Sequence, residues 1–205
     1  MNKLLIATHN KAKLSEHLLG LAPLIRKGLN VVSLTDLAIK DSPQETGKTF
    51  EENSLLKAKF YGNLSGLPTI SDDGGLIIPV LNNKPGVTSK RWPGYEASDK
   101  ELIQYTLKRL EKVHDKKRVA YLQTCICFYD PETKKSMCEE EKIKGFIAKY
   151  PTHKHRKGYP FRALFIVEEF NKYYDELSER EHQKVNHRLI ALRRLLQKIE
   201  SYLIE

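Results

Sequence analysis

Two adjacent carboxylates lie in the tetrad Asp72-Asp73-Gly74-Gly75. Glycines let the backbone approach a ligand closely, and Mg²⁺ prefers oxygen ligands while it keeps several waters. Read alone, such a tetrad is more often an ordinary turn. Two apolar, strand-like runs, Leu67–Ser71 and Leu76–Leu81, flank it, so charge is held between buried segments. This setting favours a functional site over a plain turn.

A second polar group follows the first apolar run of the chain. Thr8, Asn10 and Lys13 lie where that run ends and a helix-period stretch begins. A hydroxyl, an amide and an ammonium group at a helix N-terminus are the ingredients of an anion-binding site. A capped helix whose lysines face water would give the same short pattern, so the motif alone leaves both interpretations open.

The segment before the next helix adds an acid, and that helix adds a cation. Glu45 lies in the expected mobile loop Asp36–Lys48, where a carboxylate is by default merely solvated. It could instead bring a further oxygen ligand to the metal of Asp73, although sequence spacing alone cannot bring the two together. Lys57 lies on the following helix, near that loop.

The second half of the chain carries two basic stretches. His187-Arg188 lies inside a predicted terminal helix, where such a pair is usually a polar surface. Lys154–Tyr159 combines lysines, a histidine and an arginine with an aromatic residue, which suits contact with phosphate, a base or RNA. A solvated surface is the plain alternative for both.

The elements that must position these residues alternate between strand and helix in the first half and form hairpins in the middle. We therefore expect an α/β fold with a mixed β-sheet. Besides the two runs around the tetrad, the predicted strands are Lys3–Thr8, Asn30–Leu34, Arg118–Tyr129, Ser136–Lys149 and Leu164–Glu168, and the turn between the two long strands is Asp130-Pro131-Glu132-Thr133. The predicted helices are a stretch through Leu14, Leu18 and Leu21, then Thr49–Leu64, Asp99–Val113 and one long helix, Ser178–Leu203.

Composition bounds the class of protein. The 205 residues predict a single domain spanning 1–205, and the formal net charge of +9 attracts polyanions, whether nucleotides, nucleic acid or acidic membranes. The N-terminal apolar run is too short for a signal or a membrane span, so we expect a cytoplasmic protein without a membrane partner. The three cysteines, Cys125, Cys127 and Cys138, form no C-x-x-C pair, which favours reduced thiols over a disulfide framework.

Taken together and in order, these motifs resemble the inosine triphosphate pyrophosphatase family, enzymes that remove non-canonical purine nucleotides such as ITP, dITP and XTP. The resemblance spans essentially the whole chain and loosens between about Arg118 and Arg162. Its strongest part is the string Glu45-Thr46-Gly47-Lys48-Thr49-Phe50-Glu51-Glu52-Asn53, followed by Lys57-Ala58, Gly66-Leu67-Pro68, Ser71-Asp72-Asp73-Gly74-Gly75-Leu76, Pro85-Gly86-Val87 and Ser89-Lys90-Arg91.

The resemblance implies a fold, an activity and residue roles. The implied fold is a mixed sheet flanked by helices in two lobes, with a central nucleotide cleft, in a homodimer. Water would attack the α-phosphorus of a purine nucleoside triphosphate, which needs a deprotonating carboxylate and positive charge on the leaving pyrophosphate. The implied roles are triphosphate binding by Thr8, Asn10 and Lys13 with support from Lys57, Mg²⁺ coordination by Glu45 and Asp73, and general base catalysis by Asp73. Gly74 stands where the family commonly has Ser and keeps a backbone N–H for the substrate.

The base-binding segment departs from the family pattern. The string Tyr159-Pro160-Phe161-Arg162 aligns with a family Phe-Gly-Tyr-Asp, so an acid is replaced by Arg162, whose donors suit purine carbonyl oxygens. His182 stands in place of a substrate-contacting Lys, which adds pH sensitivity as a hypothesis. The predicted contacts to the base are Tyr159, Phe161, Arg162, His187 and Arg188, and His182 is a predicted contact to the substrate.

Two classes of function stay open at this point, and a housekeeping role on canonical or pyrimidine nucleotides, with the same chemistry, is a third possibility. The first is an active Mg²⁺-dependent purine nucleoside triphosphate pyrophosphatase. The alternative is a catalytically weak or inactive nucleotide- or RNA-binding protein on the same scaffold, which would use the basic surface. Clustered acids repel phosphate unless a metal is present, so Glu45, Asp72 and Asp73 favour the enzyme and make nucleic acid the less favoured partner.

Overall fold

The computed structural model describes residues 3–203, and these residues form two compact units. Within the described residues, the first unit contains the chain up to Asp73, the segment Thr124–Glu141 and the chain from Arg188 on. The second unit contains Gly74–Gln123 and Lys142–His187. The prediction of a single domain stays a prediction, because the chain passes repeatedly from one unit to the other.

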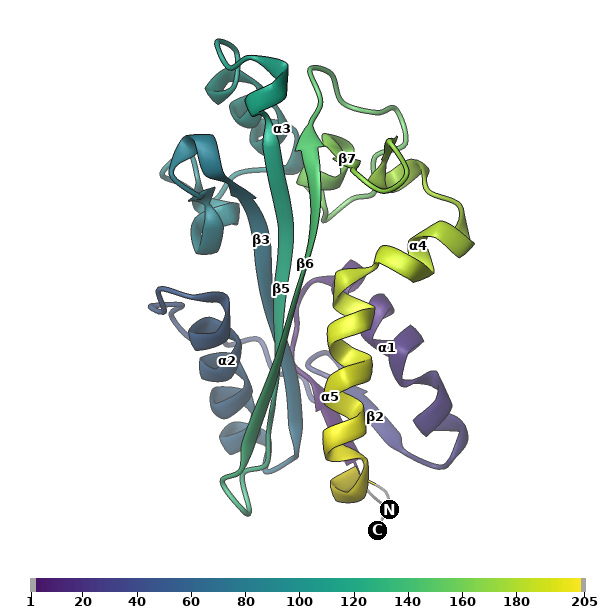
Figure 1. Cartoon of the computed structure of the whole chain (residues 1–205). Helices are drawn as coiled ribbons and strands as arrows, with labels where there is room; N and C mark the ends of the chain where they lie inside the picture. The colour runs from purple at the N-terminus through teal and green to yellow at the C-terminus, as the bar shows by residue number, and fades with distance from the viewer. Residues whose placement is uncertain (1–2, 204–205) are drawn as a thin grey trace. The chain divides into compact units, whose positions relative to one another are not determined.

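The first unit is built on parallel strands with helices between them. Strand β1 (Lys3–Ile6) pairs in parallel with β2 (Asn30–Ser33) and with β3 (Thr69–Ile78). Parallel neighbours need a crossover, and helices α1 (Lys11–Arg26) and α2 (Phe50–Ser65) lie in the two connections. Figure 1 shows α1 and α5 (His187–Leu203) together on one side of these strands and α2 on the other.

Alternation along β1 explains this layering. Successive side chains of a strand point to opposite faces, so Leu4 and Ile6 pack with residues of α1 and α5, whereas Leu5 and Ala7 pack with Tyr61 of α2. The larger of the two cores, on the α1 and α5 side, consists of Leu4, Ile6, Leu21, Leu24, Leu29, Ile70, Ile126, Phe128, Ala191, Leu192, Leu195, Ile199 and Leu203.

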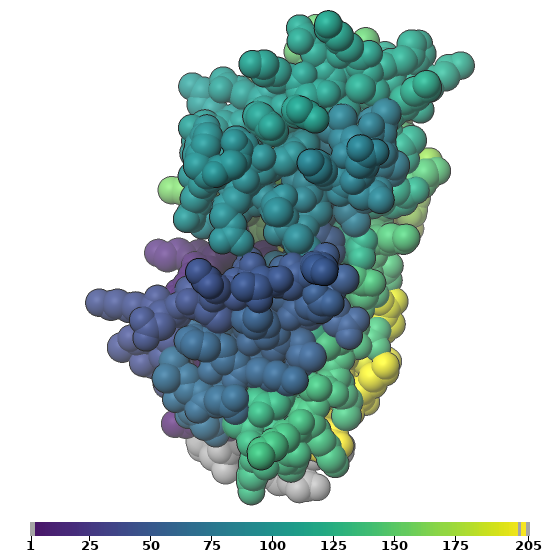
Figure 2. Space-filling view, turned by 90° about the vertical axis from the view of Figure 1, so that its left-hand side faces the viewer, coloured from purple at the N-terminus to yellow at the C-terminus, as the bar shows by residue number. Residues whose placement is uncertain are grey.

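The face covered by α2 is seen in Figure 2, where α2 and the segment before it appear in blue beside the green hairpin of β5 (Val119–Tyr129) and β6 (Ser136–Ile147). The phenolic hydroxyl of Tyr129 donates to Oδ1 of Asn63 at 3.2 Å, which joins β5 to α2. The predicted turn between β5 and β6 is confirmed, because the carboxylate of Asp130 accepts hydrogen bonds from Glu132 and Thr133.

Strand pairing in the rest of the sheet is antiparallel in the pairs β3–β4, β6–β7 and β7–β8, so the predicted mixed α/β fold is confirmed. The hydrogen-bonded order is β2-β1-β3-β5-β6-β7-β8, with β4 paired to β3. The remaining strands and helices are β4 (Lys84–Pro85), α3 (Asp99–Arg109), β7 (Phe165–Val167), β8 (Lys172–Tyr173) and α4 (Glu179–Val185), with short 3₁₀ helices at Pro79–Leu81, Gly86–Arg91, Asp115–Lys117, Pro160–Ala163 and Tyr174–Glu176.

The second unit has its own core and a buried cation. Leu76, Leu102 and Phe165 belong to this core, which draws on β3, α3 and β7. The guanidinium of Arg118 is buried and donates to the backbone carbonyls of Ile147, Leu110 and Ala148 at 2.8–2.9 Å. These three hydrogen bonds tie the start of β5 and the end of β6 to the end of α3. No helix among residues 3–203 is long and apolar enough to cross a membrane.

Three sequence predictions were wrong. The two runs around the acidic tetrad are one continuous strand, β3, because the tetrad pairs within the sheet instead of turning. The terminal helix is broken between α4 and α5 at Asn186, whose backbone is extended (φ −67°, ψ 93°), since Asn competes with the helical backbone for hydrogen bonds. The thiols are not all reduced, because Cys127 and Cys138 form a disulfide across β5 and β6.

Candidate active site

The first turn of α1 is organised by Asn10. Its Oδ1 accepts hydrogen bonds from the backbone N–H groups of Ala12 and Lys13 at 2.9 and 3.3 Å, and its own N–H donates to Oγ1 of Thr8 at 3.2 Å. Asn10 is therefore the N-cap of α1, as the plain interpretation of the motif expects. The three predicted residues Thr8, Asn10 and Lys13 lie together at the positive end of the helix dipole.

Asp72 and Asp73 face opposite sides of β3. Asp72 meets α1 and α5, and Asp73 meets α2, because neighbouring residues of a strand alternate between its two faces. Figure 1 shows β3 between these helices of the first unit. The two carboxylates that look equivalent in the sequence therefore have separate surroundings.

Asp72 is the centre of a buried ion-pair network. Its Oδ2 lies 3.0 Å from Nζ of Lys13 and 2.9 Å from Nε of Arg188, and its Oδ1 lies 3.3 Å from Nε2 of His17. The side chain of Asp72 is 0% exposed. Burial by itself raises the pKa of Asp72. The positive charges of Lys13 and Arg188 outweigh this effect, so the pKa is held well below its usual range. Asp72 is thus an anion that fixes two cations.

The network continues to a second acid. Arg188 donates through Nη1 to Oε2 of Glu16 at 2.8 Å, so one guanidinium bridges Asp72 and Glu16. Burial lowers the pKa of the Lys13 ammonium, an effect that Asp72 opposes. Sequence analysis missed Glu16 and His17, although their spacing of three and four residues from Lys13 puts all three on one helix face.

Asp73 lies against cations and amides of α2. Its Oδ1 accepts from Nζ of Lys57 at 3.2 Å, and its Oδ2 accepts from Nδ2 of Asn53 at 3.4 Å. Burial raises the pKa of Asp73, and Lys57 and Lys13 only partly offset this. Thr124 on β5 donates to the backbone carbonyl of Asp73 at 3.1 Å and steadies the strand there. Neighbouring carboxylates with pKa values pushed in opposite directions are the usual sign of divided roles.

Glu45 reaches the same ammonium group. Nζ of Lys57 lies 3.0 Å from Oε1 of Glu45, so the structure brings Glu45 to the Lys57–Asp73 pair. Burial lowers the pKa of Lys57, but Asp73 and Glu45 raise it more, and the net pKa is raised. The carboxylates of Glu45 and Asp73 therefore both contact the ammonium group of Lys57. Two carboxylates this close to one positive charge also suit a hard cation such as Mg²⁺.

Asn53, which sequence analysis missed, links the loop of Glu45 to Asp73. Its Oδ1 accepts from the backbone N–H of Gly47 at 2.8 Å, while its Nδ2 donates to Asp73. A Cβ at Gly47 would lie 2.5 Å from that Oδ1, so only glycine fits here without a shift. In the sequence, Asn53 is a polar residue on the buried face of α2, but its partner Asp73 lies on a different element, twenty residues away.

In the second unit, the predicted base contacts gather around Tyr174. The guanidinium carbon of Arg162 lies 3.5 Å from the ring centre of Tyr159 and 4.5 Å from that of Tyr174, and the arginine is buried. The rings of His182 and His187 meet Tyr174 edge to face, with centres 5.1 and 6.2 Å away. Tyr174, in the 3₁₀ helix Tyr174–Glu176, was missed because its partners Arg162 and His182 belong to other segments of the chain, which no local pattern indicates.

Phe161 and Arg188 make other contacts. Phe161 belongs to the core of the second unit and meets Trp92 edge to face, with ring centres 6.5 Å apart. Arg188 belongs to the first unit and to the network of Asp72.

Gly74 follows Asp73 on β3. The next residue, Gly75, must be glycine because a Cβ there would meet Oγ of Ser89 and the carbonyl of Gly86. The roles of these residues toward a substrate stay predictions.

Comparison with known proteins gives consistent matches over the whole chain. The model of the Ham1 family matches residues 4–198. A dITP/XTP pyrophosphatase of Haemophilus influenzae is 36% identical over 96% of this chain and 98% of its own length, and one of Bacillus subtilis is 33% identical over 98% of each. The solved structure of a HAM1 protein from Coxiella burnetii matches with a TM-score of 0.84 at 32% identity, covering 98% of this chain and all of that one.

Proposed function

Because the chain belongs to the Ham1 family, we propose that it hydrolyses non-canonical purine nucleoside triphosphates, such as ITP, dITP or XTP, to the monophosphate and pyrophosphate with the help of Mg²⁺. Relatives that match end to end carry the name dITP/XTP pyrophosphatase, so the chain is a nucleoside triphosphate pyrophosphatase, a hydrolase of acid anhydrides. The observation that supports the proposed mechanism is the opposite orientation of Asp72, which pairs with Lys13 and Arg188, and Asp73, which pairs with Lys57.

The triphosphate is bound by the start of α1. Thr8, Asn10 and Lys13 lie at the helix N-terminus, where the dipole and backbone N–H groups favour an anion. Asp72 holds Lys13 and Arg188 in place and compensates their charge, so the helix face is pre-organised before substrate arrives. Lys57 adds a second ammonium on the side of α2.

Glu45 and Asp73 bind Mg²⁺ in this proposal. The fit rests on their chemistry, since both offer carboxylate oxygens and both already converge on the ammonium of Lys57. When bound, the ion neutralises charge that develops on the phosphate oxygens. Asn53 is hydrogen-bonded both to Gly47, in the loop of Glu45, and to the side chain of Asp73. It therefore holds the two carboxylates near each other.

Asp73 accepts the proton of the attacking water. The oxygen of water forms a bond to the α-phosphorus, the bond from that phosphorus to the oxygen bridging to the β-phosphorus breaks, and pyrophosphate leaves with the electron pair. Hydrogen bonds from Lys57 and Asn53 hold the carboxylate of Asp73 in place for this role. Lys13 and Lys57 stabilise the negative charge of the leaving group.

Base recognition is assigned to the second unit. Stacking on Tyr159 and Tyr174 fixes the plane of the Arg162 guanidinium, and its donors suit the carbonyl oxygens of xanthine or hypoxanthine. His182, next to Tyr174, makes base binding pH-sensitive. We further propose a cytoplasmic homodimer, as the family resemblance implies.

Pyrophosphate release from a panel of nucleotides tests the proposal. The purified chain is assayed with Mg²⁺ and ITP, XTP, dITP, GTP, ATP, CTP and UTP, beside Asp73→Asn and the exposed-loop control Glu132→Gln. We expect turnover of the non-canonical purines, its loss in Asp73→Asn and full activity in the control. If no nucleotide of the panel released pyrophosphate and the chain bound RNA in a salt-sensitive way, the binding-protein alternative would be supported instead.

A further inference from the structure

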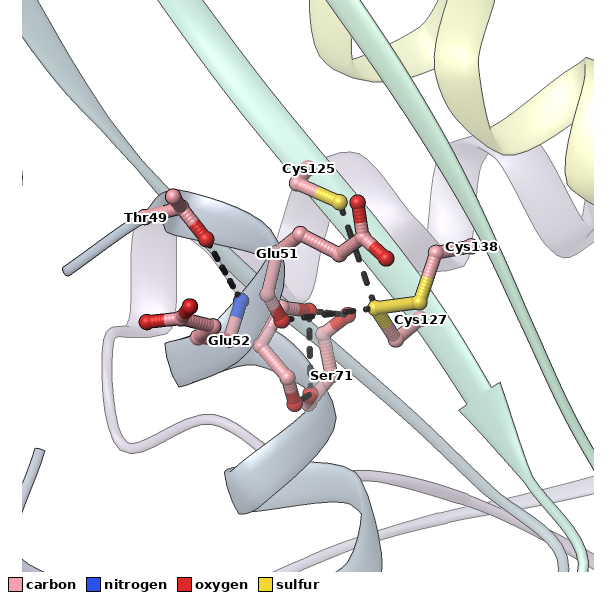
Figure 3. Close-up of a disulfide and its surroundings, with 8 residues drawn as sticks. Thr49, Glu51, Glu52, Ser71, Cys125, Cys127 and Cys138 are labelled. Atoms are coloured by element: carbon pink, nitrogen blue, oxygen red, sulfur yellow. Dashed lines mark hydrogen bonds between the residues drawn. A yellow bond between two sulfur atoms is a disulfide. The ribbon is translucent and has the colours of Figure 1, made fainter. Parts of the chain in front are cut away.

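Three cysteine sulfurs gather on neighbouring strands of the first unit. Cys125 and Cys127 lie on the same face of β5, two residues apart, and Cys138 lies on β6. Their sulfur atoms all lie within 4.8 Å of one another, and Figure 3 shows them with the start of α2 and Glu51 beside them. Among residues 3–203, this is the one group of three or more His, Cys, Asp and Glu side chains close enough to share a metal ion. It takes no part in the proposed hydrolysis.

We propose that the reduced form of this group binds one soft divalent cation, Zn²⁺ or Cd²⁺, through the sulfurs of Cys125, Cys127 and Cys138. The disulfide between Cys127 and Cys138 must first be reduced. Two equivalents of a small thiol supply the two electrons and two protons and leave as their own disulfide, which frees both cysteines. The cation then displaces the thiol protons to solvent, because a coordinating thiol is deprotonated by the metal.

The sulfur positions match such a site. A tetrahedral Zn²⁺ with Zn–S bonds of about 2.3 Å needs sulfurs about 3.8 Å apart. The sulfurs of Cys125 and Cys127 are 3.9 Å apart, so this edge of the tetrahedron is already present. Once the disulfide is broken, Cys138 needs only a rotation of its side chain away from Cys127 to complete the face. A buried pair of sulfurs on a strand and a third on its neighbour form a rigid frame for a cation.

Charge and access also favour a cation. Glu51 and Glu140 both act electrostatically on Cys125, so negative charge surrounds the sulfurs. Both glutamates are exposed and Cys138 is half-buried, which gives reductant and ion a route to the site. Figure 3 shows the carboxylate of Glu51 on the side of Cys125 and Cys138, where it or a water can supply the fourth ligand. Because Cys127 also contacts the backbone carbonyl of Glu51 at 3.9 Å, a bound ion would lie at the first turn of α2.

Metal titration of the full chain tests this proposal. The protein is reduced with a phosphine, freed of reductant under inert gas, and titrated with Co²⁺ and then Cd²⁺ while thiolate-to-metal charge-transfer absorption is recorded. We expect one cation per chain in the reduced protein, no such band in the oxidised protein, and binding at least about tenfold weaker in Cys125→Ser. Ions held by carboxylates give no sulfur band, so the Mg²⁺ site cannot mimic the result.

Two controls keep the test decisive. Glu132→Gln, on the β5–β6 turn, should bind like the parent chain, and Cys125→Ala replaces Cys125→Ser if circular dichroism shows that the serine variant fails to fold. A reduced parent chain without a charge-transfer band at equimolar cation would overturn the proposal. Unchanged affinity for the cation in a folded Cys125 variant would also overturn the proposal, because the sulfur of Cys125 would then not be a ligand.

Discussion

Replacing Asp72 by Asn should destabilise the protein strongly, whereas the same change at Asp73 should not. The side chain of Asp72 is 0% exposed and meets Lys13 and Arg188, so Asp72→Asn leaves two buried cations with one acid, Glu16, between them. Removing one partner of a buried ion pair costs about 3–5 kcal/mol. For a chain of this size, that loss corresponds to a fall in Tm of about 6–20 °C.

The control is its neighbour on the strand. Burial raises the pKa of Asp73, which means that the fold disfavours its ionised form, so neutral Asn at this position should leave the free energy of unfolding unchanged or slightly higher. Urea unfolding followed by circular dichroism at neutral pH measures both variants. A loss below about 1 kcal/mol for Asp72→Asn, or equal losses for both variants, would refute the assignment of a structural and a catalytic aspartate.

Lowering the pH should remove the contribution of Asp72 to the free energy of unfolding. The pKa of Asp72 is depressed in the fold, so its contribution to stability is complete above the unfolded pKa of about 4 and is lost as pH falls through the folded value. The difference in unfolding free energy between the parent and Asp72→Asn should therefore shrink only below about pH 4. A difference that disappears already near neutral pH would point to another group.

Three further predictions concern the loop, the base and the free thiol. Gly47→Ala would push a Cβ against Asn53, displace Glu45 and lower kcat by about a hundredfold with little change in Tm; unchanged kcat would contradict this. Arg162→Asp should shift the preference between XTP and ITP toward ITP by about tenfold in kcat/KM, and an unchanged ratio would exclude base contact. Burial raises the pKa of Cys125 to about 12, so iodoacetamide should label it at pH 8 only after unfolding; rapid labelling of the native protein would show that this thiol is reactive.

The polar residues of the site could be predicted from the sequence because their types and order carry the signal. Thr8, Asn10 and Lys13 were expected at a strand end and helix start, and the structure has them there. Glu45 could be named, but its approach to Lys57 depends on Asn53, a contact between a loop and a helix that no local pattern encodes.

Errors arose where sheet pairing overrode local preference. Asp-Asp-Gly-Gly has the composition of a turn, yet it lies within β3 beside β5 and is extended there, which allows Asp72 and Asp73 to face opposite ways. The disulfide depends on which residues of β5 and β6 lie opposite one another, and this register cannot be derived from cysteine spacing. Glu16, His17 and Tyr174 gain their importance from partners distant in the chain.

Hydrolysis of XTP in water enriched in the heavy oxygen isotope tests whether water attacks the α-phosphorus with Asp73 as the base. The parent chain is incubated with Mg²⁺ and XTP, and both products are examined by mass spectrometry beside Asp73→Asn. We expect one pyrophosphate per turnover, heavy oxygen in the xanthosine monophosphate, and no turnover in the variant. Heavy oxygen in the pyrophosphate, or full turnover by Asp73→Asn, would contradict water attack on the α-phosphorus with Asp73 as the base.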